Sequence, residues 1–130
     1  MTGVQTCALP ICTDNIVASG GNDRIVGGAG DDFLNGGTGN DIFVFASAGF
    51  GSDTIGGAVL DRFDFTGGDA LTQDLLDISG LGINAASFGA NVALVDMGTD
   101  VRVDIGADHI LLMGVLNTTD ISASDFILAA

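Results

Sequence analysis

Aspartate residues recur at a fixed interval in the first half of the chain. Four of them lie nine residues apart, and each is followed two positions later by a large apolar residue. The pairs are Asp14 with Ile16, Asp23 with Ile25, Asp32 with Leu34, and Asp41 with Phe43. Carboxylate oxygens are hard ligands, so a regular array of them could bind a hard cation such as Ca²⁺. The apolar residues in the same phase indicate that one fold positions the whole array.

The aspartates belong to a nine-residue repeat rich in glycine. Its units are ASGGNDRIV (18–26), GGAGDDFLN (27–35) and GGTGNDIFV (36–44), and TDNIV (13–17) completes an earlier one. Glycines at positions one, two and four permit backbone angles that a Cβ would forbid, so six residues can form a tight turn. The other three form a strand of about 10 Å whose middle residue faces the interior. Two units then close one coil, and turns eighteen residues apart stack on the same side.

This stacking predicts a metal site. It places Asp14 over Asp32, and Asp23 over Asp41, at the ~4.8 Å spacing of neighbouring strands, where the carboxylates would repel without a cation. A cation between turns would be bound by both carboxylates and by carbonyl groups of the glycine turns, and the flexible all-oxygen cage favours Ca²⁺ over Mg²⁺. A solvated loop whose aspartates only cap turns is the alternative, but it does not explain the common phase. The predicted metal-binding residues are Asp14, Gly20, Asp23, Gly28, Gly30, Asp32, Gly37, Gly39, Asp41, Gly51, Asp53 and Asp61.

Asp53 and Asp61 come from two decaying units, AGFGSDTI (48–55) and GGAVLDRFD (56–64). The nonapeptide resembles the calcium-binding repeat of RTX proteins. The flank resembles the C-terminal region of serralysin-type proteases and related RTX exoproteins, in NDIFVF (40–45), GSDTI (51–55), DLLDISGLG (74–82) and DFIL (125–128). The spacing of 56–73 departs from that pattern, which leaves Asp69 and Asp77 open as ligands. Asp31 and Asp64 fall outside the predicted cage and are expected on the solvated surface.

Composition narrows the class of partner. The chain of 130 residues has 17 acidic and three basic residues, a net charge of −14, and every acid is aspartate. This charge disfavours nucleic acid and anionic membranes, which call for basic patches. With 47% hydrophobic residues the chain can form a core once the charge is neutralised. No apolar run reaches the ~18 residues of a membrane span, so we expect a soluble chain, most simply a monomer.

Residues 1–12, MTGVQTCALPIC, differ in composition from the rest and resemble a translated sequencing adapter. On that interpretation Cys7 and Cys12 say nothing about redox compartment, and the natural N-terminus is missing. A genuine disordered terminus is the alternative. A zinc site is disfavoured because one cysteine pair cannot close a tetrahedral shell, and a signal peptide because the basic start and apolar stretch are lacking.

The remaining sequence predicts strands. Alternation over 91–116, with turns at Gly98–Thr99 and Gly106–Ala107, indicates strands that cap the open end of the roll, and helix is expected only as a short turn at Ala85–Phe88. The predicted fold is all-β: a parallel β-roll (RTX β-helix) followed by a C-terminal β-strand cap. The predicted segments are a disordered 1–12, a calcium-binding roll over 13–64, and a β-rich flanking region over 65–130 with a secretion signal.

No catalytic residues are predicted. The sole histidine, His109, lies beside Asp108 on a predicted strand, but no serine has a nucleophile-elbow context and no H-E-x-x-H is present. The family resemblance implies a secreted, extracellular protein that is exported by a type I secretion machinery through its C-terminus, with Asp125–Leu128 as the terminal motif. The missing upstream part could be an enzyme such as a protease or lipase. The alternatives are a carbohydrate-binding module, disfavoured by the absence of Trp and Tyr, and an adhesin with many more repeats.

Overall fold

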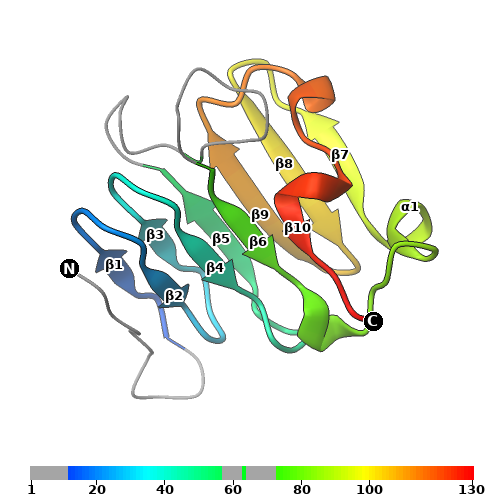
Figure 1. Ribbon diagram of the computed structural model, residues 1–130, viewed down its shortest axis with the longest axis horizontal. Coiled ribbons are helices and arrows are strands. Elements are labelled where there is room, and N and C mark those ends of the chain that lie inside the picture. The colour runs from blue at the N-terminus through cyan, green and yellow to red at the C-terminus, as the bar shows by residue number, and fades with distance from the viewer. Residues whose placement is uncertain (1–11, 57–62, 64–72) are drawn as a thin grey trace.

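The computed structural model describes residues 12–56, 63 and 73–130, which form two facing β-sheets (Figure 1). The strands of the first sheet are, in spatial order, β1 (Asn15–Val17), β3 (Phe33–Asn35), β5 (Ser52–Ile55), β9 (Asp108–Met113), β8 (Asp100–Ile105) and β7 (Ala93–Asp96). Those of the second sheet are β10 (Phe126–Ile127), β6 (Leu75–Asp77), β4 (Ile42–Val44) and β2 (Arg24–Val26). Successive repeats therefore alternate between the two sheets, as the predicted coil requires.

The stacking of coils follows the predicted register. Ile16 pairs with Leu34 in the first sheet and Ile25 pairs with Phe43 in the second, both in parallel. The turns stack with the same eighteen-residue offset, because Gly20 forms a parallel bridge with Thr38, and the N–H of Gly21 donates to the carbonyl of Thr38 at 2.9 Å. The predicted parallel β-roll is confirmed.

The stack begins within the described residues at Cys12, whose N–H donates to the carbonyl of Ala29 at 3.1 Å. Disorder was predicted for residues 1–12, and residues 1–11 of that segment lie outside the described residues.

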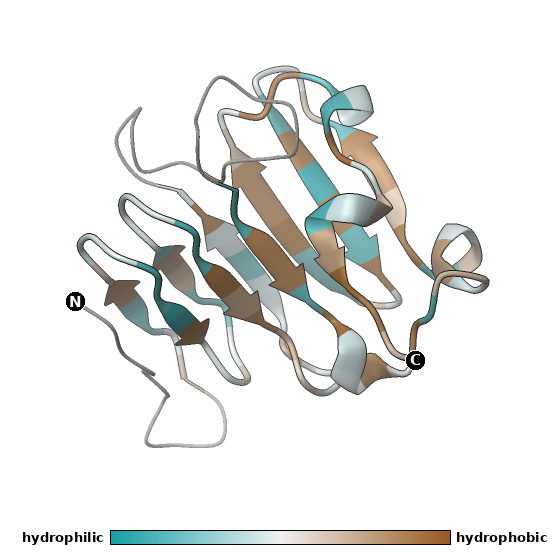
Figure 2. Ribbon diagram, viewed as in Figure 1, coloured by the Kyte–Doolittle hydropathy of each residue, from teal (hydrophilic) through white to brown (hydrophobic). Residues whose placement is uncertain are grey.

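The hydrophobic core fills the space between the sheets. The middle residue of each three-residue strand points inward, and Ile25, Leu34 and Phe43 are exposed by 2% or less. Burying one such side chain contributes roughly 1.5–3 kcal/mol. The strands are predominantly hydrophobic while the turns between them are paler or polar (Figure 2). Three-residue strands offer few such side chains each, so the coils depend on their neighbours for stability.

The C-terminal half continues both sheets. β9 pairs in parallel with β5, and β8 and β7 follow in antiparallel order. Inward residues alternate with polar outward ones along β8, where Val101, Val103 and Ile105 are buried, and Figure 2 shows this as alternating colour. Gly98 and Gly106 make the turns with φ of +91° and +64°. The predicted strands are thus present, and they cover the edge of β5.

Helical structure within the described residues is short. The helix α1 spans Phe88–Asn91, three residues later than the predicted turn at Ala85–Phe88. Residues 85–87 form a turn directly before it, in which the side-chain oxygen of Asn84 accepts from the N–H groups of Ala86 and Ser87 at 3.0 Å. The described part of the chain also has three 3₁₀ turns, at Ser79–Leu81 (η1), Thr118–Asp120 (η2) and Ala123–Asp125 (η3). In the described part of the chain, no helix is long and apolar enough to cross a membrane.

Candidate calcium site

The repeat aspartates form two rows, one along the turns that precede each sheet. In each row the backbone N–H of one aspartate donates to Oδ1 of the aspartate in the next coil. The first row is Asp14 to Asp32 at 2.8 Å and Asp32 to Asp53 at 2.9 Å. The second row is Asp23 to Asp41 and Asp41 to Asp74, each at 2.9 Å. The predicted stacking of Asp14 with Asp32 and of Asp23 with Asp41 is present.

These carboxylates are buried in a way that favours a bound cation. Asp23, Asp32 and Asp53 are exposed by only 2–3%. Both carboxylate oxygens of Asp23, and Oδ2 of Asp32 and of Asp53, are buried without a hydrogen-bond partner. A buried charge without a partner is strongly unfavourable, and buried anions are normally paired or bound to metal. Asp23, Asp32 and Asp53 therefore provide buried oxygen atoms that lack a positive partner.

Two aspartates of the first row have raised pKa values, which also favours a bound cation at this row. Burial raises the pKa of Asp53 to about 7, against a partial lowering by the N–H of Asp32, and the neighbouring charges of Asp32, Asp31 and Asp108 raise it further. The pKa of Asp32 is also raised, chiefly by burial, with added repulsion from Asp14 and Asp31. Both shifts have the same origin: anions gathered away from water. A divalent cation would reverse the sign of the local field.

The glycines of the turns have two different functions. Those at positions two and four adopt positive φ, as at Gly28 (+102°) and Gly39 (+133°), which side chains rarely adopt. Those at position one are needed for space, since a Cβ on Gly27 or Gly36 would collide with the carboxylate of the aspartate five residues later. The prediction that position one needs glycine for its backbone angles was therefore wrong. There the close approach of the carboxylate excludes a side chain.

The donor set suits a hard ion. Within the described residues, no group of three or more His, Cys, Asp or Glu side chains surrounds one point. An ion between coils would therefore need carbonyl oxygens as well as carboxylates. Mixed carbonyl and carboxylate ligation without strict geometry is typical of Ca²⁺, whereas Mg²⁺ prefers an octahedral shell with retained water. The residues present fit calcium.

The structure places most of the predicted site residues together. Asp14, Asp23, Asp32, Asp41 and Asp53 occupy the two rows, and the positive-φ glycines of the intervening turns include Gly28, Gly30, Gly37, Gly39 and Gly51. Gly20 differs, because it forms an isolated parallel bridge with Thr38 and has no positive φ. Asp61, Asp64 and Asp69 lie outside the described residues.

Asp74 is the row member that sequence reasoning missed. It is 2% exposed and accepts the N–H of Asp41, although 33 residues separate the two. Asp77, left open as a ligand, instead caps a local turn by accepting from the N–H and hydroxyl of Ser79 at 3.0 and 2.6 Å. The missed signal was the pair Asp74 and Leu76, which repeats the spacing of Asp41 and Phe43 without its glycine turn in register.

A second, outer ladder lies one residue before the rows. Asn22 Oδ1 accepts from the N–H of Asn40 at 2.9 Å, Asn40 Oδ1 from Gln73 at 2.7 Å, and Asp31 Oδ1 from Ser52 at 2.9 Å. Asp31 is exposed, as expected, but it also caps the next coil. Either Asn or Asp can occupy this position, because only a carbonyl-like acceptor is required.

The side chain of His109 contacts Asp104 and not an aspartate of the rows, although its backbone pairs with Ser52. Its Nδ1 is 2.9 Å from Oδ1 of Asp104, which also forms a two-pronged ion pair with Arg102 at 2.6 and 2.8 Å. Asp108, the sequence neighbour of His109, belongs to the opposite face of the strand and binds the N–H groups of Gly49 and Gly51. From sequence alone, Asp108 and His109 could be combined with a serine into a Ser-His-Asp arrangement. In the structure their side chains contact different partners and not each other.

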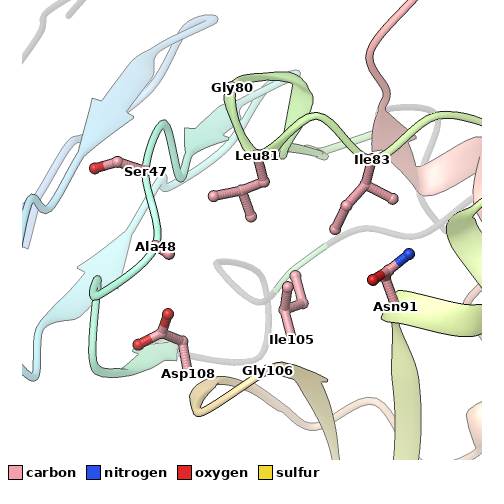
Figure 3. Close-up of a pocket in the computed structure, with 9 residues that line it drawn as sticks. All are labelled: Ser47, Ala48, Gly80, Leu81, Ile83, Asn91, Ile105, Gly106 and Asp108. Atoms are coloured by element: carbon pink, nitrogen blue, oxygen red, sulfur yellow. The ribbon is translucent and has the colours of Figure 1, made fainter.

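A cavity of about 420 Å³ opens where the roll meets the C-terminal hairpin (Figure 3). Its lining is mainly apolar, and Asp108 is the only ionisable residue among the described residues that line it. The lining residues are Ser47, Ala48, Gly80, Leu81, Ile83, Asn91, Ile105, Gly106 and Asp108. Ser47 has no base beside it in this set, so the cavity presents no assembled nucleophile and base.

Two facing sheets of short parallel strands, with rows of buried aspartates along glycine turns, define a calcium-type β-roll. Residues 13–43 match the family described as the RTX calcium-binding nonapeptide repeat, in four copies. RTX nonapeptide repeats are calcium-binding motifs, and calcium is accordingly the ion that this repeat binds.

A solved structure shares the fold. The extracellular lipase LipA from Serratia marcescens matches with a TM-score of 0.51 and 19% sequence identity, over 95% of this chain and 21% of the lipase chain. The chain thus spans about a fifth of the length of that protein. No curated protein sequence matches the chain. Residues 13–43 thus carry the RTX calcium-binding nonapeptide repeat, and the chain has a β-roll fold.

Proposed function

We propose that the chain is a calcium-triggered folding module of a secreted protein. The observation that carries the proposal is the set of buried carboxylate oxygens without partners in Asp23, Asp32 and Asp53. Without calcium these charges oppose stacking of the coils, and the short strands bury little apolar surface to offset them. With calcium the same oxygens become ligands. Ion binding and folding are then one process.

The magnitude is sufficient for a switch. A ligand present at ten times its Kd contributes about 1.4 kcal/mol for each independent site that only the folded state offers. Two to four such sites would contribute ~3–6 kcal/mol, comparable with the whole stability of a small domain. Cytosolic calcium is low and extracellular calcium is high, so the chain would remain unfolded inside the cell and fold outside.

The proposed export route is type I secretion through the C-terminus. The terminal segment supports coupling between export and folding, because Asp125 and Phe126 are buried and β10 pairs with β6. A signal in this segment would be accessible only while the module is unfolded. The module itself would be non-catalytic. Any enzymatic activity, such as the lipase activity named for LipA, would belong to an upstream part of the parent protein.

Calcium titration with magnesium as the matched ion tests the proposal. We expect residues 13–55 to be largely unprotected from hydrogen exchange in chelator and cooperatively protected in calcium, with magnesium much less effective at equal concentration. Circular dichroism would report the same transition. Slow exchange at Ile25, Leu34 and Phe43 in chelator would show that the apolar core alone holds the roll, and calcium would not be the switch.

A further inference from the structure

Among the described residues, the turn that precedes Asp53 is the last repeat turn of the first row. On one side it stacks on the preceding coil, where Gly30 donates its N–H to the carbonyl of Phe50 at 3.2 Å. On its other side the described part of the chain has no further repeat turn in this row. The C-terminal hairpin β8–β9 lies there instead, because β9 pairs with β5.

Asp108 binds this turn from the hairpin. Its Oδ2 accepts from the N–H of Gly49 at 2.8 Å, and its Oδ1 accepts from the N–H of Gly51 at 3.1 Å. The N–H of His109 adds a bond to the carbonyl of Gly51 at 2.9 Å. The carboxylate points toward the loop that carries Ala48 (Figure 3). Asp108 thereby joins the hairpin to Gly51, which is 57 residues earlier in the chain, and to Gly49, which is 59 residues earlier.

The turn needs such a clamp. Gly49 and Gly51 have φ of +86° and +95°, and glycine in this region is conformationally free in the unfolded chain. The preceding turn in this row, at residues 27–31, is bonded to a neighbouring coil on both sides, through Cys12 to Ala29 and through Gly30 to Phe50. At the end of the row a carboxylate with two charge-assisted hydrogen bonds replaces the missing neighbour.

Asp108 differs from the row aspartates in one respect. Both of its oxygens accept N–H groups, whereas Oδ2 of Asp53 is buried without a partner. At the Asp53 end of the first row, Asp53 and the turn therefore provide the atoms that can bind an ion. Asp108 contributes by holding the turn through its hydrogen bonds.

Building on the proposed function, we infer that Asp108 is a positioning residue for the last calcium site of the first row, the site shared by Asp32 and Asp53. It fixes the peptide groups 48–49 and 50–51 so that the turn meets the ion in a prepared geometry. Calcium affinity at this end then depends on the docked hairpin, and by thermodynamic reciprocity calcium at this site stabilises the docking of the hairpin.

The test uses Asp108→Asn in the full chain, with Asp100→Asn as the matched control. Asp100 lies in the same hairpin and also accepts a glycine N–H, from Gly114 at 2.8 Å, but it is remote from the rows. Isothermal titration calorimetry with calcium would measure the affinity of each class of site. We expect Asp108→Asn to weaken one class about tenfold, the scale for loss of a group that supports metal ligands, and the control to match the wild type.

A positioning role is separated from a general structural role by calcium rescue. Raising calcium should restore slow exchange at the amide of Thr54, which donates to the carbonyl of Asp32 at 2.8 Å, and the thermal midpoint at saturating calcium should return close to that of the wild type. Unchanged affinities for all classes in a folded Asp108→Asn would overturn the inference. The inference would also be overturned if the thermal midpoint of Asp108→Asn stayed low in saturating calcium while its calcium affinities were unchanged.

If Asp108→Asn does not fold, Gly49→Ala decides. A Cβ at Gly49 meets open space, so this change strains only the turn and leaves Asp108 in place. Selective weakening of one class of site in Gly49→Ala supports the inference, and wild-type affinities overturn it. A wild-type chain that binds no calcium would instead contradict the proposed function.

Discussion

Replacing Asp74 with alanine tests whether the second row extends beyond the recognisable repeats. Asp74 is 2% exposed and accepts the N–H of Asp41, itself buried. Removing the acceptor leaves that N–H unsatisfied, which costs about 1–3 kcal/mol. If calcium binds in this row, one carboxylate ligand is lost as well. We therefore expect Asp74→Ala to lower the free energy of unfolding in saturating calcium by ~2–3 kcal/mol or more.

Asp77→Ala is the matched control, because Asp77 lies three residues away at the end of β6 and its side chain accepts hydrogen bonds from Ser79. It should cost about 1 kcal/mol, the scale for a turn cap. In chelator, the difference in unfolding free energy between the two variants should shrink or change sign. The reason is that deletion of Asp74 removes a negative charge that repels the other aspartates of the row. Urea unfolding with and without calcium measures both differences. Equal losses for the two variants in calcium would refute the assignment of Asp74 to the row.

Three further outcomes follow from burial and charge. Asp41→Ala should raise the calcium concentration needed for folding more than Asp31→Ala, because residue 41 is fully buried in its row and residue 31 is exposed; equal midpoints in calcium titrations by circular dichroism would contradict the repeat register. Leu34→Ala, at 0% exposure, should lower the free energy of unfolding by about 2–5 kcal/mol, and Val17→Ala, at 53%, by less than ~0.5 kcal/mol; a thermal or urea comparison that finds the two alike would place the core elsewhere. The ion pair with arginine lowers the pKa of Asp104, so its contribution is present above the unfolded pKa near 4 and is lost as pH falls through the folded value. Because the pair is only partly buried, Asp104→Asn should cost less than about 1 kcal/mol at pH 6 and progressively less as the pH falls through the folded pKa, as thermal midpoints measured at decreasing pH would show.

Much of the roll could be predicted from sequence alone because its interactions repeat. Nine-residue spacing specifies which residues turn, which face inward and which stack eighteen residues away, as Ile25 with Phe43 illustrates. The alternation in β8 likewise predicted the hairpin, since one face of a strand must be buried. In both cases the information is local and periodic, so a single sequence contains it.

Only the tertiary structure showed the contacts that have no period. Asp74 joins the second row across 33 residues, and Asp108 reaches the Gly49–Gly51 turn across 57 or more, so no spacing rule connects these residues. The function of the position-one glycines was also hidden, because it depends on a carboxylate folding back against Gly27 and not on a backbone angle. The sequence determined the coil and the chemistry of its ligands. The packing of distant segments decided where each row of aspartates ends, because that depends on which chain segment covers the last turn.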